Sequence, residues 1–188
     1  MPRNEKSYLL TWFKKLKAVN LLGGKCVTCG EQRPWLLGFH HEDPSLKEFG
    51  FNIKKEYRWS LIEIEIKKCR LVCYNCHKEE HHIDGSTKSQ INKILCLDYK
   101  KIKKCEICGY DRCLEALEFH HTREKKSIIG DTINNMGARR SVDGLPIRLK
   151  KELDKCSVLC ANCHHDQHFD KDRFFKNRPK ILHIKHPP

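Results

Sequence analysis

Hydrophobic residues follow a helical spacing near the beginning of each half of the chain. From Tyr8 to Leu22 the apolar side chains gather on one face, and Gly23-Gly24 directly follow. A second stripe of this kind runs from Ile91 to Ile102. Because apolar residues three and four positions apart share a helix face and glycine often ends a helix, we predict helices over 8–22 and about 91–102.

Two short apolar runs, Leu36–His41 and Leu117–His121, each end in a pair of histidines. Their length and apolar content predict strands, on which neighbouring side chains point to opposite faces. Asp43-Pro44 follows the first run and a glycine-containing segment follows the second, so loops are expected there.

A further helix is predicted before the last cysteines of each half. Residues at spacing i, i+4, i+7, i+11 form an apolar stripe in both: Ile62, Ile66, Cys69 and Cys73, then Leu149, Leu153, Cys156 and Cys160. The alternation within 62–66 by itself also suits a strand. We expect Cys69 and Cys156 to be buried apolar side chains rather than ligands, and Cys96 and Cys113 to be core or surface thiols.

The chain repeats itself at a spacing of about eighty residues. The first Cys-x-x-Cys recurs after 79 positions (Cys26 to Cys105), the His-His pair after 80 (His41 to His121) and the second Cys-x-x-Cys after 87 (Cys73 to Cys160). A fixed period indicates duplication of one unit. We therefore predict a first module at 1–85, a second at 86–178 and a basic C-terminal tail at 179–188. The tail is expected to be an untethered terminus, and an arm that touches phosphates is the alternative.

Composition suggests that each module needs a metal. The chain has 188 residues, 39% of them hydrophobic, so two half-size units would have thin cores. Eight of its twelve cysteines form four Cys-x-x-Cys pairs: Cys26/Cys29, Cys73/Cys76, Cys105/Cys108 and Cys160/Cys163. Two pairs per module suit a tetrahedral thiolate site for a structural Zn²⁺, with no position left for a substrate.

Thiolate zinc sites are expected in a reducing compartment. The apolar stretch near the N-terminus is broken by Lys14, Lys15 and Lys17, unlike a signal peptide, and no apolar run is long enough to span a bilayer. We expect a cytoplasmic protein, not a secreted or membrane-bound one.

The formal charge of +13 indicates a polyanionic partner. Residues 1–85 carry 15 basic and 11 acidic residues, a net +4, and residues 86–188 carry 22 and 13, a net +9. Next to zinc modules, this charge favours nucleic acid.

The histidines lie outside the zinc sites. On a helix, His77 and His81 share one face a turn apart, and so do His164 and His168. On the strands, one member of each pair, His40-His41 and His120-His121, can share a metal with the helical histidine, and the other can accept a proton. His82 and His165 are expected to be structural.

The pattern Phe-His-His, a loop, then Lys-Cys-x-x-x-Cys-x-Asn-Cys-His-x-x-x-His resembles the HNH nuclease family, specifically its zinc-containing ββα-metal members. The resemblance covers nearly all of both repeats. It implies an α+β fold with two tandem ββα-metal (HNH) modules, each with a four-cysteine zinc knuckle and flanking helices.

The resemblance also implies a role for each histidine. His41 and His121 would be the general bases. One Mg²⁺ or Mn²⁺ per site would be held by His40 and His77 and by His120 and His164, with His81 and His168 as further metal or phosphate contacts.

The chain departs from the family pattern at the position of the asparagine that usually orients the general base. Lys68 and Lys155 stand at its usual positions, while Asn75 and Asn162 lie between the cysteines, where we expect them to cap the metal helix. Candidates for DNA contact are basic residues in the loops: Lys54, Lys55, Arg58, Arg139 and Arg140.

The resemblance implies a metal-dependent DNA endonuclease of prokaryotic or phage-like type. Two complete sites in one chain suggest a monomeric pseudo-dimer that cuts both strands of duplex DNA, with a type II restriction enzyme as the preferred role. The alternatives are a phage or intron-encoded homing endonuclease, or a non-catalytic double zinc-knuckle protein that binds nucleic acid.

Overall fold

The computed structural model describes residues 3–48, 58–81, 87–124, 126–127, 129–134 and 144–184. Four of the residues predicted to contact DNA (Lys54, Lys55, Arg139 and Arg140), together with His82, lie outside these residues. The chain divides into two units, one of residues 1–77 with 168–188 and one of residues 78–167. The division passes through the helices α3 and α7, which are described below together with the strands that precede them.

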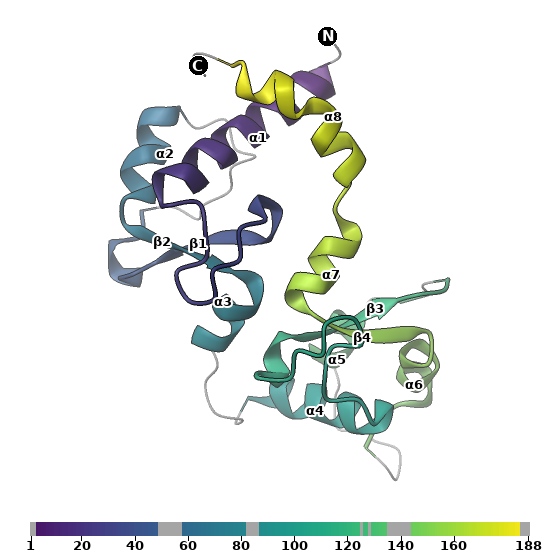
Figure 1. The fold of residues 1–188 in the computed structure, drawn as a ribbon. Coiled ribbons are helices and arrows are strands. Elements are labelled where there is room, and N and C mark those ends of the chain that lie inside the picture. The colour runs from purple at the N-terminus through teal and green to yellow at the C-terminus, as the bar shows by residue number, and fades with distance from the viewer. Residues whose placement is uncertain are drawn as a thin grey trace. The chain divides into compact units, whose positions relative to one another are not determined.

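The fold is mixed α+β with two small antiparallel sheets (Figure 1). The first unit contains α1 (Arg3–Leu21), the 3-10 turns η1 (Pro34–Leu36) and η2 (Pro44–Leu46), β1 (Leu37–His41), α2 (Trp59–Ile66), β2 (Cys69–Cys73), the first part of α3 (Tyr74–Glu80) and α8 (Lys171–Leu182). The second contains α4 (Lys88–Lys100), η3 (Leu114–Ala116), β3 (Leu117–His121), α5 (Ile129–Asn134), α6 (Ile147–Leu153), β4 (Cys156–Cys160) and α7 (Ala161–His168).

The two sheets have the same register, as expected of a duplication. Strand β1 pairs with β2 so that Leu37 faces Cys73 and His41 faces Cys69. Strand β3 pairs with β4 so that Leu117 faces Cys160, and this alignment continues to His121, which faces Cys156. A helix follows each pair of strands directly, α3 after β2 and α7 after β4.

The helices predicted near 8–22 and 91–102 are confirmed as α1 and α4. Helix α1 is followed by Gly23 with a φ of 87°, a conformation that costs glycine little. Helix α4 begins with a capping box, in which the Thr87 side chain accepts from the backbone N–H of Gln90 and the Gln90 side chain accepts from that of Thr87.

The helix predicted before the distal cysteines is confirmed only over its first part. Helix α2 ends at Ile66 and α6 at Leu153, and the cysteines that follow lie on strands β2 and β4. The apolar residues 69, 71, 72 and 73 of β2 are all buried. Pairing with β1 satisfies the backbone of this segment, so the helical spacing of its cysteines does not make it a helix.

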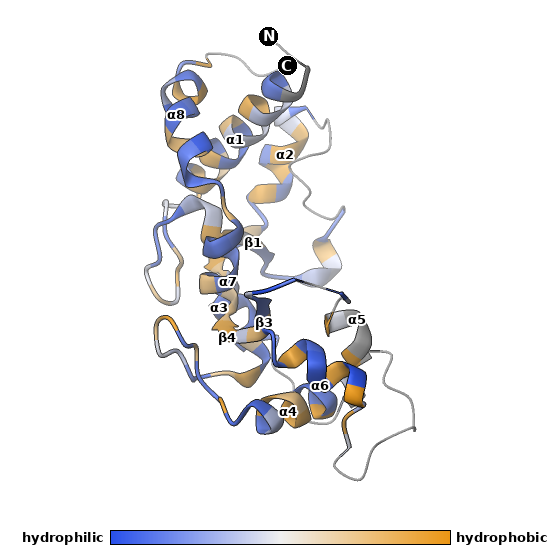
Figure 2. Cartoon of the chain, turned by 90° about the vertical axis from the view of Figure 1, so that its right-hand side faces the viewer, coloured by the Kyte–Doolittle hydropathy of each residue, from blue (hydrophilic) through white to orange (hydrophobic). Residues whose placement is uncertain are grey.

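Each sheet packs on helices through its apolar face. In the first unit, Leu37, Leu71 and Val72 form a cluster with Val19 of α1. In the second, Leu117, Val158 and Leu159 pack with Leu97 of α4. The helices α1, α2 and α4 carry both hydrophobic and hydrophilic residues along their length in Figure 2, as expected of helices that cover a core on one side.

The C-terminal segment differs from the predicted tail. Helix α8 packs along α1 (Figure 1), and Phe174 and Ile181 are buried among aromatic side chains that include Trp12 and Trp35. The Trp35 ring stacks on Phe169 at 4.7 Å between centroids. Helix α8 is thus fixed to the first unit, because Phe174, Asn177 and Ile181, at i, i+3 and i+7, form its buried face.

Within the described residues, no helix combines the length and the apolar character that crossing a bilayer would require.

Candidate metal centres and a buried carboxylate–histidine pair

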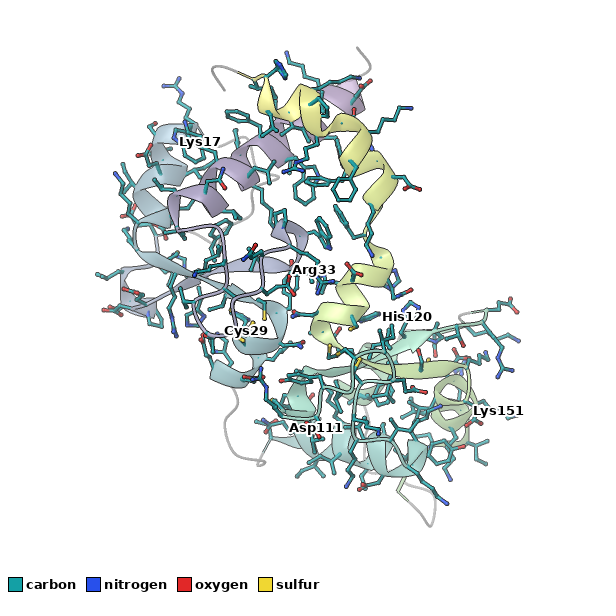
Figure 3. The ribbon with its side chains drawn as sticks, viewed as in Figure 1. Lys17, Cys29, Arg33, Asp111, His120 and Lys151 are labelled. Carbon is teal, nitrogen blue, oxygen red and sulfur yellow. The ribbon has the colours of Figure 1, made fainter. Side chains whose placement is uncertain are left out.

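Two cysteine tetrads, Cys26/Cys29/Cys73/Cys76 and Cys105/Cys108/Cys160/Cys163, bring their sulfur atoms within 4.8 Å of one another. The sulfurs of Cys29 and Cys73 are 3.6 Å apart, and those of Cys108 and Cys160 are 3.7 Å apart. Two thiolates bound tetrahedrally to one zinc at about 2.3 Å lie about 3.8 Å apart, whereas a disulfide requires about 2.05 Å. Both tetrads therefore fit a four-cysteine zinc site, and Figure 3 shows sulfur atoms beside the labelled Cys29.

In each tetrad, the first two cysteines lie on a tight turn, and the two turns have the same form. The backbone N–H of Gly30 donates to the carbonyl of Cys26, and that of Gly109 donates to the carbonyl of Cys105, both at 2.9 Å. Gly30 and Gly109 have φ values of 77° and 75°, in the left-handed region. The Cys-x-x-Cys-Gly sequence thus forms the same metal-binding turn twice.

Backbone N–H groups also favour the thiolate form of one cysteine in each turn. Burial alone would raise the pKa of the Cys26 thiol, but backbone hydrogen bonds from Cys29 and Cys73 lower this pKa to about 7. Burial and backbone hydrogen bonds act in the same way on Cys105, whose pKa is also lowered to about 7. Burial raises the pKa of Cys29 in the first turn to about 11, so Cys26 is the thiol of that turn that most readily becomes the thiolate that zinc binds.

The N-cap of each metal helix is a cysteine rather than the predicted asparagine. Helix α3 begins at Tyr74, and the sulfur of Cys73 accepts from the backbone N–H of Cys76 at 3.5 Å. The equivalent contact from Cys163 to Cys160 is 3.4 Å. Asn75 and Asn162 lie inside the first turn of α3 and α7, two positions after the N-cap.

The cysteines outside the tetrads lie in the apolar interior, as predicted for the pair Cys69 and Cys156. Both are 5% exposed, and their thiols contact the backbone carbonyls of Glu65 and Glu152. Cys96 and Cys113 are also buried.

Two histidine clusters each include a histidine that directly follows a tetrad cysteine, His77 after Cys76 and His164 after Cys163. The first cluster (His40, His77 and His81) and the second cluster (His120, His164 and His168) each bring one ring nitrogen per residue within 4.8 Å of the others. The rings of His40 and His77 have centroids 5.1 Å apart and cross at 76°, and those of His120 and His164 have 5.2 Å and 78°. The predicted metal histidines are thus brought together in both halves.

The clusters are open, unlike the cysteine tetrads. The two histidines nearest the sheet are half-buried in each cluster, and the third, His81 or His168, is exposed. Three imidazole nitrogens that converge with an exposed side can hold a divalent ion and leave positions for water or a substrate.

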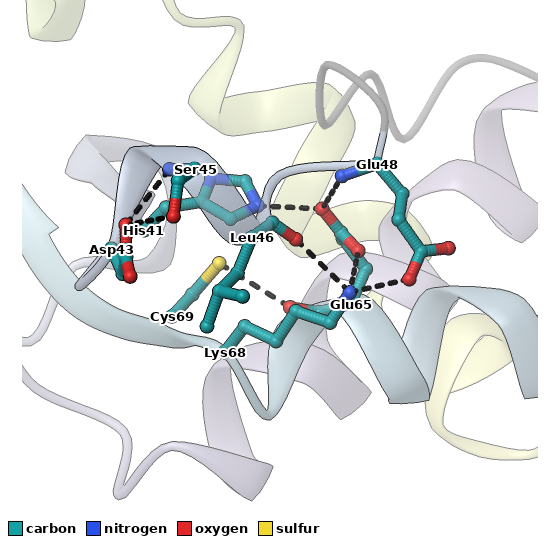
Figure 4. A network of polar contacts seen from close by, with 8 residues as sticks. All are labelled: His41, Asp43, Ser45, Leu46, Glu48, Glu65, Lys68 and Cys69. Carbon is teal, nitrogen blue, oxygen red and sulfur yellow. Dashed lines mark hydrogen bonds and ion pairs between the residues drawn. The ribbon is translucent and has the colours of Figure 1, made fainter.

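His41 is separated from the first cluster and hydrogen-bonded to a buried carboxylate (Figure 4). Its Nε2 atom lies 2.7 Å from Oε1 of Glu65, a side chain of α2 that is 1% exposed. The Nζ of Lys68 donates to Glu65 Oε2 at 3.1 Å, and the backbone N–H of Glu48 donates to Glu65 Oε1 at 3.1 Å. These donors satisfy a carboxylate that would otherwise be costly to bury.

The second half repeats this arrangement. His121 Nε2 lies 3.2 Å from Oε2 of Glu152. The Nζ of Lys155 donates to Oε1 of Glu152 at 2.6 Å, and the backbone N–H of Lys126 donates to Oε2 at 3.2 Å. The hydrogen bond from Lys155 lowers the pKa of Glu152 to about 2. Burial would raise the pKa of Glu65, but hydrogen bonds from His41 and Lys68 outweigh it and lower this pKa.

An ionised carboxylate can only accept a hydrogen bond, so the neutral ring of His41 carries its proton on Nε2 and its lone pair on Nδ1. The same holds for His121. Glu65 and Glu152 therefore select one tautomer of each ring and fix its orientation. In the HNH family an asparagine is expected in this role, and the sequence offers none at its usual position.

A signal for these glutamates was present in the sequence. Glu152 follows Glu65 by 87 positions, the same interval that separates Cys73 from Cys160. Lys68 and Lys155, which occupy the position expected for an orienting asparagine, share this interval and hold the glutamates. The local pattern of 62–66 does not mark Glu65 as buried, and only the packing of α2 shows that it is.

Of the residues predicted to contact DNA, Arg58 alone is described, and it is the residue before α2, where it is exposed.

Comparisons of the chain with protein-family models, with curated proteins and with solved structures gave no match.

Proposed function

We propose that the protein is a divalent-metal-dependent DNA endonuclease with two HNH (ββα-metal) modules. One observation carries this proposal. In each half, two consecutive histidines at the end of a strand are divided between two tasks, because the first joins a histidine cluster and the second is hydrogen-bonded through Nε2 to a buried glutamate. A purely structural histidine pair requires no such division, and the same division occurs twice.

Each histidine cluster would hold one divalent cation. Imidazole suits Zn²⁺, Fe²⁺ and Ni²⁺, whereas Mg²⁺ and Mn²⁺ favour carboxylate, carbonyl and water oxygens, so the three-histidine donor set by itself fits a later transition metal better than either Mg²⁺ or Mn²⁺. When bound, the cation would neutralise charge on the scissile phosphate and stabilise the leaving oxygen. The cysteine tetrads would hold two structural zinc ions.

The histidine outside each cluster would act as general base. Nδ1 of His41 would take a proton from a water molecule, whose oxygen attacks phosphorus as the bond to the 3′ oxygen breaks. Glu65 would stabilise the imidazolium that forms, because its negatively charged carboxylate is already hydrogen-bonded to Nε2 of the ring. His121 and Glu152 would have the same roles at the second site.

Duplex DNA is the proposed substrate. The net charge of +13 would supply most of the binding free energy through phosphate contacts, so affinity would fall steeply with salt. Two complete sites suit cleavage of both strands, and a restriction endonuclease is the role that we favour.

A plasmid assay with Mn²⁺ tests the proposal. The zinc-loaded protein should linearise supercoiled DNA, while His41→Ala or His121→Ala should yield mainly nicked circles and the double variant should be inactive. His165→Ala is the matched control, because His165 lies on α7 next to His164 but outside both clusters. If both single variants still linearise the plasmid, the hypothesis that each site cuts one strand is refuted. Absence of cleavage with Mg²⁺, Mn²⁺, Ni²⁺ and Zn²⁺ would favour the non-catalytic zinc-knuckle protein.

A further inference from the structure

The two histidine clusters differ in one strand residue beside them. Gly38 of β1 faces Val72, and Glu118 of β3 occupies the same register position, where it faces Leu159. Since alternate residues of a strand lie on one face, Glu118 lies on the same face as His120, two residues on. The second cluster therefore has a neighbouring carboxylate that the first lacks at this position.

Glu118 contacts a predicted metal ligand directly. Its Oε2 atom lies 2.6 Å from Nδ1 of His164, and both side chains are about three-quarters buried. With Nδ1 held by Glu118, the other ring nitrogen of His164 is the one that can bind a cation. A carboxylate in this position fixes the ring and raises its basicity as a ligand.

Two lysines also lie near Glu118. Lys78 and Lys93 both act on its carboxylate through their charge, and Lys93 donates to the backbone carbonyl of Glu115 at 2.6 Å. The contact with His164 places the Glu118 carboxylate beside the second cluster.

A second difference between the halves also favours cation binding at the second cluster over the first. Arg70 faces His40 across the first sheet, and Ser157 faces His120 across the second. Residues directly opposite one another in antiparallel strands share a face and lie about 5 Å apart at Cβ. Arginine is always positively charged, so Arg70 brings a positive charge to the face of the first sheet that carries His40, and the neutral Ser157 brings none to the face that carries His120.

We propose that the second histidine cluster binds a divalent cation about 10- to 100-fold more tightly than the first, because of Glu118 and the exchange of Arg70 for Ser157. Under the proposed nuclease function, on which this consequence rests, the two sites load in order. At limiting cation the chain nicks one strand through His121, and at higher cation concentration it cuts both.

A Mn²⁺ titration of the zinc-loaded chain tests the difference in affinity between the two clusters. The electron paramagnetic resonance signal of free Mn²⁺ reports how much is bound. Mn²⁺ competes poorly for thiolates already holding zinc. The unmodified chain should show one tight and one weak site, and His120→Ala should remove the tight one. Glu118→Gly should weaken the tight site about 10-fold or more, and Glu118→Gln should have a smaller effect, since its amide oxygen can still accept from His164.

Gly38→Glu is the complementary variant. A Cβ at position 38 would meet only the Val72 carbonyl oxygen at 3.9 Å, an ordinary contact, so the backbone tolerates a residue other than glycine there. The weak site should become tighter, and Gly38→Glu with Arg70→Ser should bring it close to the tight one. Glu124→Gln, at an exposed carboxylate outside the clusters, is the control and should leave both sites unchanged.

Two results would overturn the proposal: two sites of equal affinity in the unmodified chain, or a tight site that Glu118→Gly leaves unchanged while zinc content and circular dichroism are normal. Unequal Mn²⁺ sites without DNA cleavage under any condition would instead refute the nuclease function alone. Cleavage that passes from nicking to linearisation as Mn²⁺ rises would support both proposals.

Discussion

The Nε2 atom of His41 and the Oε1 atom of Glu65 lie 2.7 Å apart, with both side chains nearly excluded from solvent. The pair joins the end of β1 to α2, and His121 and Glu152 form its counterpart between β3 and α6. Because the buried glutamate fixes one imidazole tautomer, the relationship determines which nitrogen of the histidine can accept a proton.

Glu65→Gln should lower the nicking rate of the first site by roughly 100-fold or more, because a glutamine NH₂ can donate to Nε2 and favour the unproductive tautomer. The measurement is made in a His121→Ala background, where the first site alone is expected to cut. The pH dependence of nicking should also change, which a loss of stability alone would not produce. Glu63→Gln on the same helix is the control, since Glu63 accepts from Trp59 rather than from His41. A Glu65→Gln chain that nicks at the parental rate would contradict the role of Glu65.

The stability contributed by Glu152 should depend on pH in a defined window. The folded-state pKa is lowered to about 2, whereas an unfolded glutamate titrates near 4.3. A lowered folded pKa gives stability that is complete above the unfolded pKa and is lost as the pH falls through the folded pKa. The difference in unfolding free energy between the parent and Glu152→Gln should therefore be constant from pH 7 to about 5 and shrink toward pH 3 in urea titrations at equal zinc. A difference that stays constant at low pH would show that Glu152 is not ionised in the way described.

Each chain should contain two zinc ions, and Cys26→Ser or Cys160→Ser should reduce the content to one. Because zinc binding is coupled to folding, the affected unit should lose helical circular dichroism, and chelation should unfold both units. Cys96→Ala is the control: it removes a fully buried thiol outside the tetrads and should keep two zinc ions at a stability cost of about 1 kcal/mol. Atomic absorption with circular dichroism provides the measurement, and a Cys26→Ser chain with two zinc ions would refute the first zinc site.

Phe174→Ala should destabilise the first unit by about 3–5 kcal/mol, since the side chain is 2% exposed and packs against Trp12 and Trp35. Phe175→Ala is the neighbouring control, at a residue that is 51% exposed, and should cost about 1 kcal/mol or less. Urea unfolding followed by tryptophan fluorescence measures both. Equal effects of the two substitutions would mean that α8 does not pack on α1 as described.

Local pattern was sufficient to predict the duplicated parts of the molecule. Residue spacing predicted the cysteine tetrads, the strands that end in His41 and His121, the helices α1 and α4, and the convergence of one histidine of each pair with a helical histidine. The resemblance to the HNH family implied that this histidine is His40 in the first half and His120 in the second. The turns and helices depend on short intervals in the chain, so the backbone geometry of a single element fixes them. The tetrads could be predicted as well, because four cysteine pairs supply the four ligands that each of two zinc ions requires.

Other features depended on packing between elements distant in the sequence. Pairing with β1 made Cys69–Cys73 a strand despite its helical spacing, and contact with α1 fixed the C-terminal helix that sequence suggested was a tail. Burial of Glu65 became evident only when α2 was placed against the end of β1. A charged residue is usually solvent-exposed, and only the donors that surround it in three dimensions, His41 and Lys68, make its burial favourable. The sequence by itself thus determined which residues could bind metal, and the tertiary structure decided which carboxylates orient the histidines and which cluster has Glu118 beside it.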